Sequence, residues 1–276
     1  MSPREMSFIN MTGNKKKLIG DIFQSFDRHY NTSNYIEPFF GSGGAYCNLP
    51  IQFDKYECSD IIPFVIDFLN SKYDFDMLAT FFEGVMKRWD IQNCKEDYYS
   101  FRDFWNQNKD KSDKLKNIGF ILLANACINN MMRFGPQGFN QSYGNRSITK
   151  ERLCSLYSLV KPNTVFKVKD FREVEYVTDS FVYLDPPYSG TGAMTNMYGF
   201  YNWAAQEDKD LLTLIAQKKK DCSFVLSTID GSILEKYLIR IGFSKYNING
   251  KKYKVTPWAF DAKDYQEVIL TNINAI

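Results

Sequence analysis

Residues 185–188, with the sequence Asp-Pro-Pro-Tyr, combine groups that suit chemistry on a planar amine. The two prolines hold φ at about −65° and lack an amide hydrogen, so they form a stiff turn whose carbonyl oxygens are free to accept hydrogen bonds. The Asp185 carboxylate and the Pro186 carbonyl supply two acceptors for the two hydrogens of an exocyclic amine, and the Tyr188 ring supplies a stacking surface. We therefore expect these residues to act on the amino group of an aromatic base.

The segment that must position this turn is the apolar run Ser180–Leu184. Its β-branched and aromatic residues predict a buried strand, which ends at the prolines because they cannot pair in a sheet. Asp185 would then lie at the point where the chain leaves the sheet. An ordinary strand-end turn with a capping Asp185 is the alternative, since Asp-Pro pairs are common in turns.

A second turn with chemical potential lies at residues 35–44, Tyr-Ile-Glu-Pro-Phe-Phe-Gly-Ser-Gly-Gly. The pattern predicts a short strand and then a glycine turn, which lets the backbone approach a ligand closely. Asp60 follows the next predicted strand, residues 55–59. A carboxylate about 20 residues beyond a glycine turn is placed to bind a ribose hydroxyl in a Rossmann-like sheet. A plain turn, and a helix N-cap at Asp60, are the alternatives.

The order of these blocks resembles that of the amino-methyltransferases that use S-adenosyl-L-methionine: Phe39-x-Gly41-x-Gly43, then Asp60, then residues 185–188. Further blocks resemble phage and bacterial DNA adenine-N6 methyltransferases of the GATC-methylating type. These blocks are residues 12–15 (Thr-Gly-Asn-Lys), residues 130–134 (Asn-Met-Met-Arg-Phe), Gly138-Phe139, residues 143–146 (Tyr-Gly-Asn-Arg) and Trp203-x-x-x-Gln206-x-Asp208. The resemblance covers nearly the whole chain, and it implies an S-adenosylmethionine-dependent enzyme whose partner is double-stranded DNA.

The resemblance also implies roles for individual residues. It assigns catalysis to Asp185, Pro186 and Tyr188. It assigns cofactor binding to residues of the N-terminal loop, the glycine turn and several strand ends, namely Thr12, Gly13, Lys15, Glu37, Phe39, Gly41, Gly43, Asp60, Asp170, Phe171 and Asp185. The alternatives are that Lys15 lies in an ordinary first helical turn and that Phe171 is a core residue beside a turn aspartate.

DNA binding is assigned to a recognition domain between the glycine turn and the catalytic turn. Its candidate contacts are Asn130, Arg133, Tyr143 and Arg146. An arginine can bond the edge of a guanine with two hydrogen bonds, whereas a phosphate contact carries no sequence information. Both arginines could instead be solvated surface residues. The chain departs from the family pattern at residues 128–129 and at 142, so we expect either GATC or a related or relaxed target site.

Hydrophobic periodicity predicts an α/β fold with a Rossmann-like, mostly parallel sheet and a C-terminal antiparallel pair. The predicted helices are residues 15–26, 61–69, 205–218 and 233–241, and the later strands are residues 165–171, 224–227, 252–255 and 267–271. Gly250 is expected to form the turn of a terminal hairpin. Residues 189–202, rich in Gly, Thr, Ser and Asn, are expected to form a loop that closes over substrate.

The pattern changes between residues 73 and 164. Helical periods at residues 76–89, 96–105 and 114–130 are followed by a glycine-punctuated, hairpin-like segment at residues 132–143. We therefore predict an inserted target-recognition domain at residues 73–164. The catalytic, S-adenosylmethionine-binding domain would comprise residues 1–72 and 165–276.

Composition excludes several classes of protein. A chain of 276 residues that is 44% hydrophobic can bury a substantial core, and it has neither a long uncharged apolar run nor an apolar leader, so we expect a cytoplasmic protein without membrane contact. Six scattered cysteines and one histidine predict no metal site. The net charge of +2 argues against a large nonspecific nucleic-acid binder but allows a local basic patch. A monomer or weak dimer is expected.

The mechanism that follows begins with extrusion of an adenine from the duplex, which exposes N6 at a cost of a few kcal/mol. Asp185 and the Pro186 carbonyl would then orient the amine toward a sulfonium methyl group. Two other functions remain open from the sequence. One is an RNA or protein amino-methyltransferase, and the other is a non-catalytic DNA-binding regulator on the same scaffold.

Overall fold

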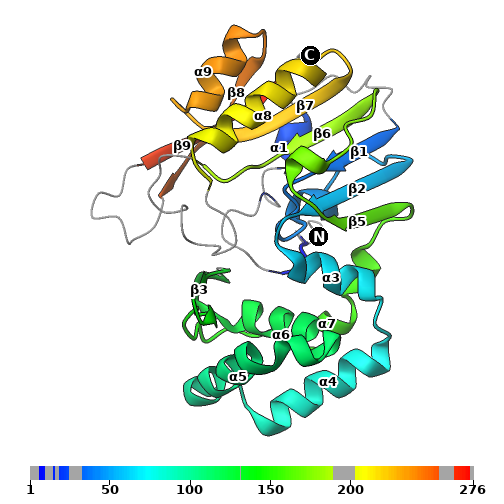
Figure 1. Cartoon of the computed structure of the whole chain (residues 1–276), viewed down its shortest axis with the longest axis vertical. Helices are drawn as coiled ribbons and strands as arrows, with labels where there is room; N and C mark the ends of the chain where they lie inside the picture. Colours follow the sequence, from blue (N-terminus) through cyan, green and yellow to red (C-terminus); the bar gives the residue numbers. More distant parts are fainter. Residues whose placement is uncertain are drawn as a thin grey trace.

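The structure, a computed structural model, describes residues 6–9, 15, 19–24, 33–130, 132–188, 203–254 and 264–273. A twisted sheet with helices on both faces lies above a helical lobe in Figure 1. Among the described residues, no helix combines the length and the hydrophobicity needed to cross a bilayer. The same part of the chain contains no group of His, Cys, Asp and Glu side chains able to hold a metal ion.

The sheet has seven strands in the order β5-β2-β1-β6-β7-β9-β8. The strands are β1 (Asn34–Glu37), β2 (Lys55–Asp60), β5 (Thr164–Val168), β6 (Ser180–Leu184), β7 (Cys222–Ile229), β8 (Ser244–Lys254) and β9 (Asp264–Thr271). From β5 to β7 neighbouring strands are parallel, and β9 pairs antiparallel with both β7 and β8. The predicted fold class is therefore confirmed.

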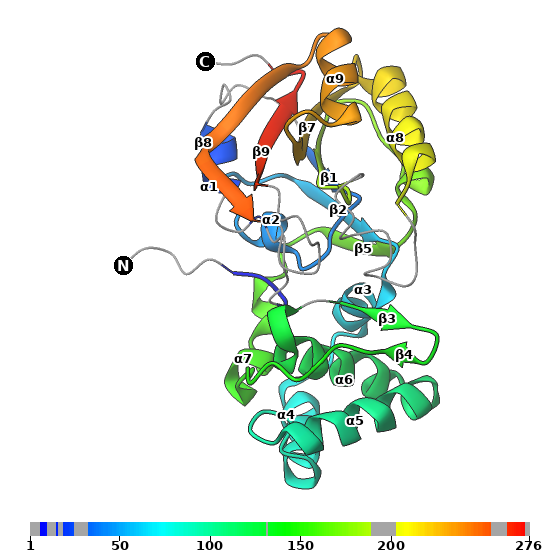
Figure 2. The ribbon, with the colours of Figure 1, turned by 90° about the vertical axis from the view of Figure 1, so that its left-hand side faces the viewer.

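Strand β6 lies at the centre and is buried along its whole length. Because side chains alternate along a strand, Phe181 and Tyr183 join one apolar cluster, and Val182 and Leu184 join a second. Helices cover both faces of the sheet (Figure 2), and Asp185 follows directly where β6 ends. The predicted buried strand before the catalytic turn is thus present.

The helices around the sheet are short and amphipathic. They are α1 (Ile19–Gln24), α2 (Gly44–Cys47), α3 (Pro63–Ser71), α8 (Ala205–Lys218) and α9 (Ile233–Arg240), with a 3₁₀ turn, η4 (Phe171–Glu173). In α8, Leu211, Leu212 and Ile215 are buried in the cluster that contains Val182. On the other face, the ring of Phe23 from α1 stacks on Phe181 at 5.0 Å between centroids.

The helical lobe is organised around α6 (Asp113–Ala126), whose residues from Asn117 to Ala126 are all buried. The other elements of the lobe are α4 (Phe75–Arg88), α5 (Lys95–Asn108), α7 (Lys150–Cys154), the 3₁₀ turns η1 (Lys109–Lys111), η2 (Ile128–Asn130) and η3 (Leu156–Leu159), and the hairpin β3 (Phe134–Gly135) with β4 (Gly138–Phe139). Asp74 and Ser112 cap α4 and α6 by accepting backbone N–H bonds. The predicted hairpin is confirmed.

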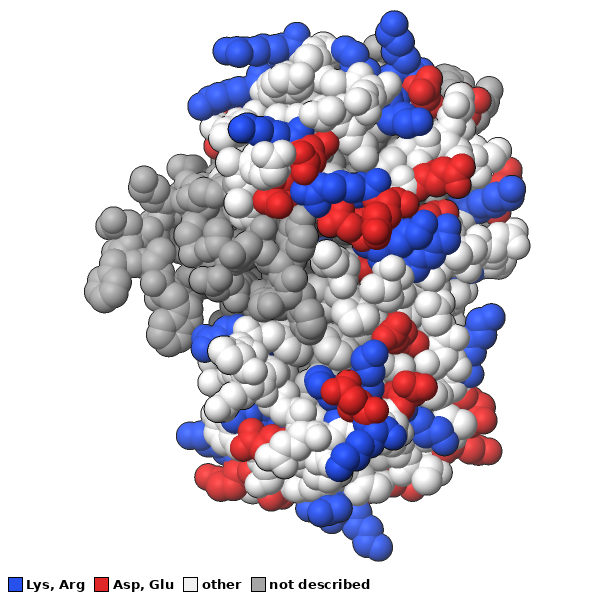
Figure 3. Space-filling model, viewed as in Figure 1, with Lys and Arg blue, Asp and Glu red and all other residues white. Residues whose placement is uncertain are grey.

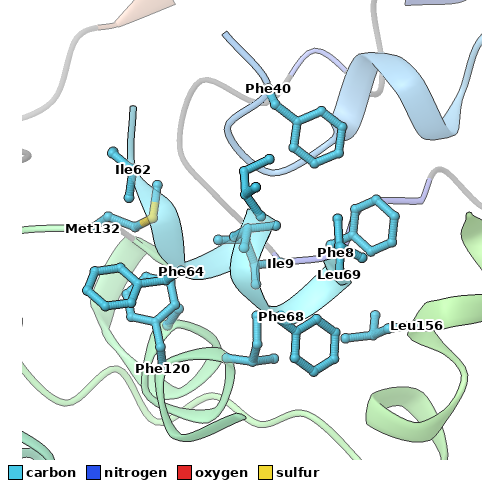
Figure 4. Packing of buried hydrophobic residues seen from close by; sticks show 14 of the residues in the cluster. Phe8, Ile9, Phe40, Ile62, Phe64, Phe68, Leu69, Phe120, Met132 and Leu156 are labelled. Carbon is cyan, nitrogen blue, oxygen red and sulfur yellow. The ribbon is translucent and has the colours of Figure 1, made fainter. Parts of the chain in front are cut away.

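Helix α3 joins the two halves of the molecule. It contacts β5 on one side and α6 on the other, and the rings of Phe64 and Phe120 stack at 4.4 Å between centroids. Figure 4 shows α3 between Phe40 above and Phe120 and Leu156 below. A single apolar cluster therefore extends from the sheet into the helical lobe. The division of function between residues 73–164 and the rest stays a prediction.

Two predicted helix boundaries differ from the structure for identifiable physical reasons. Helix α3 begins at Pro63 rather than residue 61, because proline suits the first helical position and Asp60 caps the backbone before it. Helix α6 ends at Ala126, four residues before the expected end at Asn130, where a short bridge pairs Cys127 with Tyr143.

The predicted turn at Gly250 is wrong. Strand β8 continues through this glycine to Lys254, with a register shift against β9 between Asn247 and Lys252. Glycine inside a strand often marks such an irregularity. The antiparallel terminal pair exists, and its last paired residues among those described are Lys254 and Asp264. The expected loop at residues 189–202 lies outside the described residues.

Candidate functional site

A pocket opens at the carboxyl ends of β1, β2 and β6. After β1 the chain moves outward to β2, whereas β6 pairs on the opposite side of β1, so the pocket lies where the strand order reverses. Open parallel sheets bind ligands at this kind of position. The predicted residues Lys15, Glu37, Phe39, Gly41, Asp60, Asp170, Phe171, Asp185, Pro186 and Tyr188 all line it. The sheet thus gathers side chains that are far apart in the sequence.

The glycine turn depends on two left-handed residues, Gly41 with φ 52° and Gly43 with φ 70°. A Cβ atom at Gly43 would lie 2.6 Å from a ring carbon of Phe8 and 2.8 Å from one of Phe40, so only glycine fits. Gly43 supports the turn from behind and is not among the residues that line the pocket. Gly41 forms the pocket wall itself.

Asp60 ties the glycine turn to the end of β2. Its Oδ2 accepts a hydrogen bond from the Gly41 N–H at 2.7 Å, and its Oδ1 accepts one from the Ile62 N–H at 2.9 Å. Burial raises the pKa of Asp60 to about 6, although these backbone donors favour the ionised form. The carboxylate therefore caps the backbone before α3 and also faces the pocket, and its contact with a ribose stays a prediction.

Lys15 bridges two carboxylates at the centre of the site, those of the partly exposed Asp185 and the buried Glu267. Its Nζ lies 3.0 Å from Asp185 Oδ1 and 2.9 Å from Glu267 Oε1. The Tyr188 hydroxyl donates a hydrogen bond of 2.5 Å to the same Glu267 oxygen and lies 3.2 Å from Ser227 Oγ. Lys15 thus lies beside the Asp-Pro-Pro-Tyr turn, and its role in cofactor binding stays a prediction. Thr12 and Gly13, its predicted partners in the N-terminal loop, lie outside the described residues.

The two oxygens of the Asp185 carboxylate lie in different environments. Oδ1 contacts Lys15 and lies 3.5 Å from the Tyr188 hydroxyl, whereas Oδ2 has no hydrogen-bond partner within the described part of the chain. The side chain is 21% exposed, and it lines the pocket. Burial and the negative charge of Glu267 raise the pKa of Asp185 to about 6, against the opposing effect of Lys15. At neutral pH the open oxygen is therefore an acceptor.

Glu267, at the start of the buried part of β9, was not identified by the sequence analysis. Burial opposes ionisation of this residue, but Lys15 and the hydroxyls of Tyr188 and Ser227 together outweigh burial and hold its pKa below the ordinary value. It belongs to none of the recognised motifs. The one signal in the sequence is an acidic residue directly before the apolar run Val268–Leu270.

Glu37 is buried beneath the pocket and is 2% exposed. Its Oε2 accepts a hydrogen bond of 2.8 Å from the Tyr35 hydroxyl. Burial, together with the nearby charges of Asp185 and Asp60, raises the pKa of Glu37 well above its usual range. The buried hydroxyl of Tyr183, which also lines the pocket, has no hydrogen-bond partner in the described residues.

Three aromatic rings form an apolar wall of the pocket. Phe39, Phe171 and Trp203 lie 5.5 Å from one another between ring centroids. Asp170 caps the 3₁₀ turn that presents Phe171, because its Oδ1 accepts a hydrogen bond from the Arg172 N–H at 2.9 Å. Phe171 is therefore a buried core residue that also lines the pocket. The sequence offered these two roles as alternatives, but one position allows both.

The predicted DNA contacts in the helical lobe are mostly bound to other protein groups. Asn130 is buried, and its Nδ2 donates to the carbonyl of Ala124 at 3.0 Å. Its Oδ1 accepts a hydrogen bond of 2.6 Å from Arg146 Nη1. The Tyr143 hydroxyl donates to the carbonyl of Gln92 at 2.7 Å. These three side chains hold the lobe together, and their contact with DNA stays a prediction.

Arg133 and Arg146 are both exposed, but within the described part of the chain only Arg146 is bonded to a buried side chain, that of Asn130. Arg133 Nε donates to Asn140 Oδ1 at 3.0 Å across the hairpin. Met132, directly before it, is buried and lines the pocket beside Ile62 (Figure 4). The exposed Arg133 therefore lies at the base of the hairpin, directly after a residue of the pocket wall.

Comparison with known proteins agrees with this geometry. The family model for D12 class N6 adenine-specific DNA methyltransferases matches residues 12–256. The chain is 29% identical over 230 residues to the type II methyltransferase M.MjaIII of Methanocaldococcus jannaschii, covering 78% of this chain and 80% of that protein.

Two DNA adenine methylases are also similar. The protein from Vibrio cholerae is 26% identical over 227 residues, which cover 78% of this chain and 77% of the relative. The protein from Haemophilus influenzae is 26% identical over 262 residues, covering 90% and 84%. Because the family model spans most of the chain and includes both the glycine turn and the catalytic turn, the protein belongs to the D12 class of N6 adenine-specific DNA methyltransferases.

Proposed function

We propose that the protein transfers the methyl group of S-adenosylmethionine to N6 of an extruded adenine in double-stranded DNA, at GATC or a related site. The observation that carries this proposal is the divided Asp185 carboxylate, with Oδ1 held by Lys15 and Oδ2 open to the pocket. The same pocket contains the glycine turn and Asp60. The methyl donor and the target amine would therefore bind in the same pocket, beside the end of β6.

The residues present fit S-adenosylmethionine. The pocket offers Asp60 for ribose hydroxyls and the rings of Phe39 and Phe171 for the adenine ring. The Tyr183 hydroxyl, buried without a partner among the described residues, is available to a polar group of the ligand. When bound, the cofactor supplies an electrophilic methyl group on a sulfonium. The chain's own residues bind it, orient it and exclude water from it.

The catalytic turn would hold the target amine by its two hydrogens. Asp185 Oδ2 and the Pro186 carbonyl are the acceptors, and together they aim the nitrogen lone pair at the methyl group. The Tyr188 ring would stack on the extruded base and recover part of the few kcal/mol that extrusion costs. The proton from N6 passes to Asp185 or to water as the new C–N bond forms. Positioning and electrostatics would supply most of the rate gain.

Target recognition would use the exposed Arg133 beside the pocket. On the face shown in Figure 3, Lys and Arg side chains are interspersed with Asp and Glu over both lobes. The described part of that face therefore lacks the broad basic surface of a nonspecific binder. Sequence preference would come from individual contacts such as a bidentate bond from Arg133 to a guanine edge.

The test uses the whole chain with S-adenosylmethionine that carries a radioactive methyl group. The acceptors are a duplex with one GATC site, the same duplex with the site scrambled, and an RNA of matching sequence. The proposal predicts N6-methyladenine in the GATC duplex and at least about tenfold less label elsewhere, since one wrong base pair costs about 1–3 kcal/mol. Equal labelling of both duplexes would remove the target site from the proposal. Transfer to RNA alone would remove the proposed substrate.

A further inference from the structure

We propose that Glu267 is a positioning residue for methyl transfer, which holds Tyr188 and Lys15 in place around the Asp185 carboxylate. This proposal rests on the function proposed above. Three donors from three different parts of the chain converge on one oxygen, Glu267 Oε1. They are Lys15 Nζ at 2.9 Å, the Tyr188 hydroxyl at 2.5 Å and Ser227 Oγ at 2.7 Å.

The tether on Tyr188 determines where the stacking surface lies. A tyrosine after a strand end can rotate about its side-chain bonds, and stacking on a base requires a defined ring plane. The hydrogen bond to Glu267 holds the hydroxyl end of this ring. Because the acceptor is ionised and 5% exposed, the bond belongs to the strong, charge-assisted kind. Glu267 therefore orients the ring without touching the base.

Glu267 also determines which oxygen of the Asp185 carboxylate Lys15 contacts. Lys15 lies between the two carboxylates and contacts only Oδ1 of Asp185 among the described contacts. Without the charge of Glu267, the ammonium group of Lys15 would be drawn to Asp185 alone and could cover both of its oxygens. The oxygen needed by the amine would then be blocked. Glu267 thus keeps the acceptor open.

The cluster of charges gives the proposal a specific pH signature. The described groups that face Asp185 are Lys15, Tyr188, Glu267 and Tyr183, with Glu37 behind them. The negative charge of Glu267 is one of the causes that raise the pKa of Asp185. Replacing Glu267 with a neutral side chain removes this cause, so the acidic limb of the rate profile should move to lower pH.

A matched control exists elsewhere in the same sheet domain. Glu235, on α9, is also buried, and its Oε1 lies 2.6 Å from Lys245 Nζ. Its Oε2 accepts a hydrogen bond from the Gly231 N–H. Neither Glu235 nor Lys245 lines the pocket. Glu235→Gln therefore has the same chemical change and a comparable loss of a buried ion pair, without any effect on the site.

The experiment compares Glu267→Gln with Glu235→Gln in single-turnover methylation of a GATC duplex at saturating S-adenosylmethionine. We expect Glu267→Gln to lower the rate constant by about one to two orders of magnitude, because catalytic groups are displaced. We also expect the acidic limb of the pH–rate profile to move to lower pH, because the negative charge of Glu267 is lost. Cofactor affinity, measured by calorimetry, should change by less than about threefold. Glu235→Gln should leave both the rate constant and the limb unchanged for the folded protein.

Two further variants keep the result interpretable. Tyr188→Phe removes only the tethered hydroxyl, and Glu267→Asp keeps the charge on a shorter side chain. The acidic limb of the pH profile should move to lower pH with Glu267→Gln and stay in place with Glu267→Asp. With Tyr188→Phe it should move to higher pH, because the hydrogen bond from the Tyr188 hydroxyl lowers the pKa of Asp185. Unchanged rate and unchanged limb in Glu267→Gln would overturn the positioning role. Absence of transfer by the unaltered protein would instead overturn the proposed function, so the two failures are distinguishable.

Discussion

The pocket at the sheet edge and the hairpin end of the helical lobe both concentrate polar residues, but they use them in opposite ways. In the pocket, Asp185 keeps one oxygen without a partner among the described residues. In the lobe, Asn130, Tyr143 and Arg146 are bonded to backbone or to one another. An open group is available for chemistry, whereas a satisfied one serves the architecture. Within the lobe, Arg133 is the exposed candidate that has no buried partner among the described residues.

The largest expected effect comes from removal of the open acceptor. Asp185→Ala should lower single-turnover methyl transfer by about 10³-fold or more, because both the acceptor for the amine and its electrostatic orientation are lost. Circular dichroism should show a retained fold, and calorimetry should show retained S-adenosylmethionine binding. Asp230→Ala, at a surface aspartate paired with Lys245, is the control. Activity of Asp185→Ala near that of the control would contradict the assignment.

The pH dependence of transfer should come from the pocket and not from the lobe. The pKa of Asp185 is raised to about 6, so the carboxyl group is ionised above this value and protonated below it. A protonated Asp185 donates a hydrogen bond and cannot accept one from the amine at that oxygen. The single-turnover rate should be constant well above pH 6 and fall about tenfold per unit below it. A flat profile through this range would show that transfer does not need the ionised group.

Arg133→Ala tests whether this exposed arginine at the base of the hairpin reads the DNA sequence. Loss of a bidentate contact costs about 1–3 kcal/mol of discrimination, so preference for the intact site over one with a changed guanine should fall by roughly fivefold to 150-fold. Methylation of duplexes with each position of the site changed in turn measures this effect. Equal weakening on every duplex would identify a phosphate contact instead.

Arg146→Ala should have the smallest effect on methylation and a clear effect on stability. It leaves Oδ1 of the buried Asn130 without its hydrogen bond from Arg146, which costs about 1–3 kcal/mol. Thermal unfolding should shift downward by several degrees, at about 2–4 °C for each kcal/mol. Arg240→Ala, an exposed arginine of α9, should leave the unfolding temperature nearly unchanged. Altered site preference in Arg146→Ala, with stability intact, would move this residue to the DNA-reading group.

The sequence predicted the pocket well because parallel strands end at a common edge. Glu37, Asp60 and Asp185 each follow or end a predicted strand, so adjacency of those strands brings them together. Glu267 and Ser227 escaped prediction because their meeting depends on the antiparallel register of β9 against β7, which no short motif encodes. The residue pattern within a segment predicts whether it forms a helix or a strand. Which side chains contact each other depends on how distant segments pair, and the pattern does not contain that information.

The roles of the lobe residues were harder to predict for a different reason. A polar residue type indicates that a side chain needs hydrogen-bond partners but not whether those partners are protein or nucleic acid. Asn130, the last residue of η2, adopts a left-handed backbone conformation with φ 49°, and its amide points inward to the carbonyl of Ala124. Gly250 shows the same limit, since glycine suits both a turn and an irregular strand.

Helix α3 would make donor binding and duplex binding mutually dependent if a bound duplex displaced the helical lobe. It packs on α6 of the helical lobe, and its first turn follows the residue whose carboxylate closes the glycine turn. A duplex that displaces the lobe and carries α3 with it also moves the ribose end of the pocket. By reciprocity, the donor then changes the affinity for duplex by the same factor as duplex changes the affinity for the donor. Such an enzyme would sense that its target is in place before committing its methyl group.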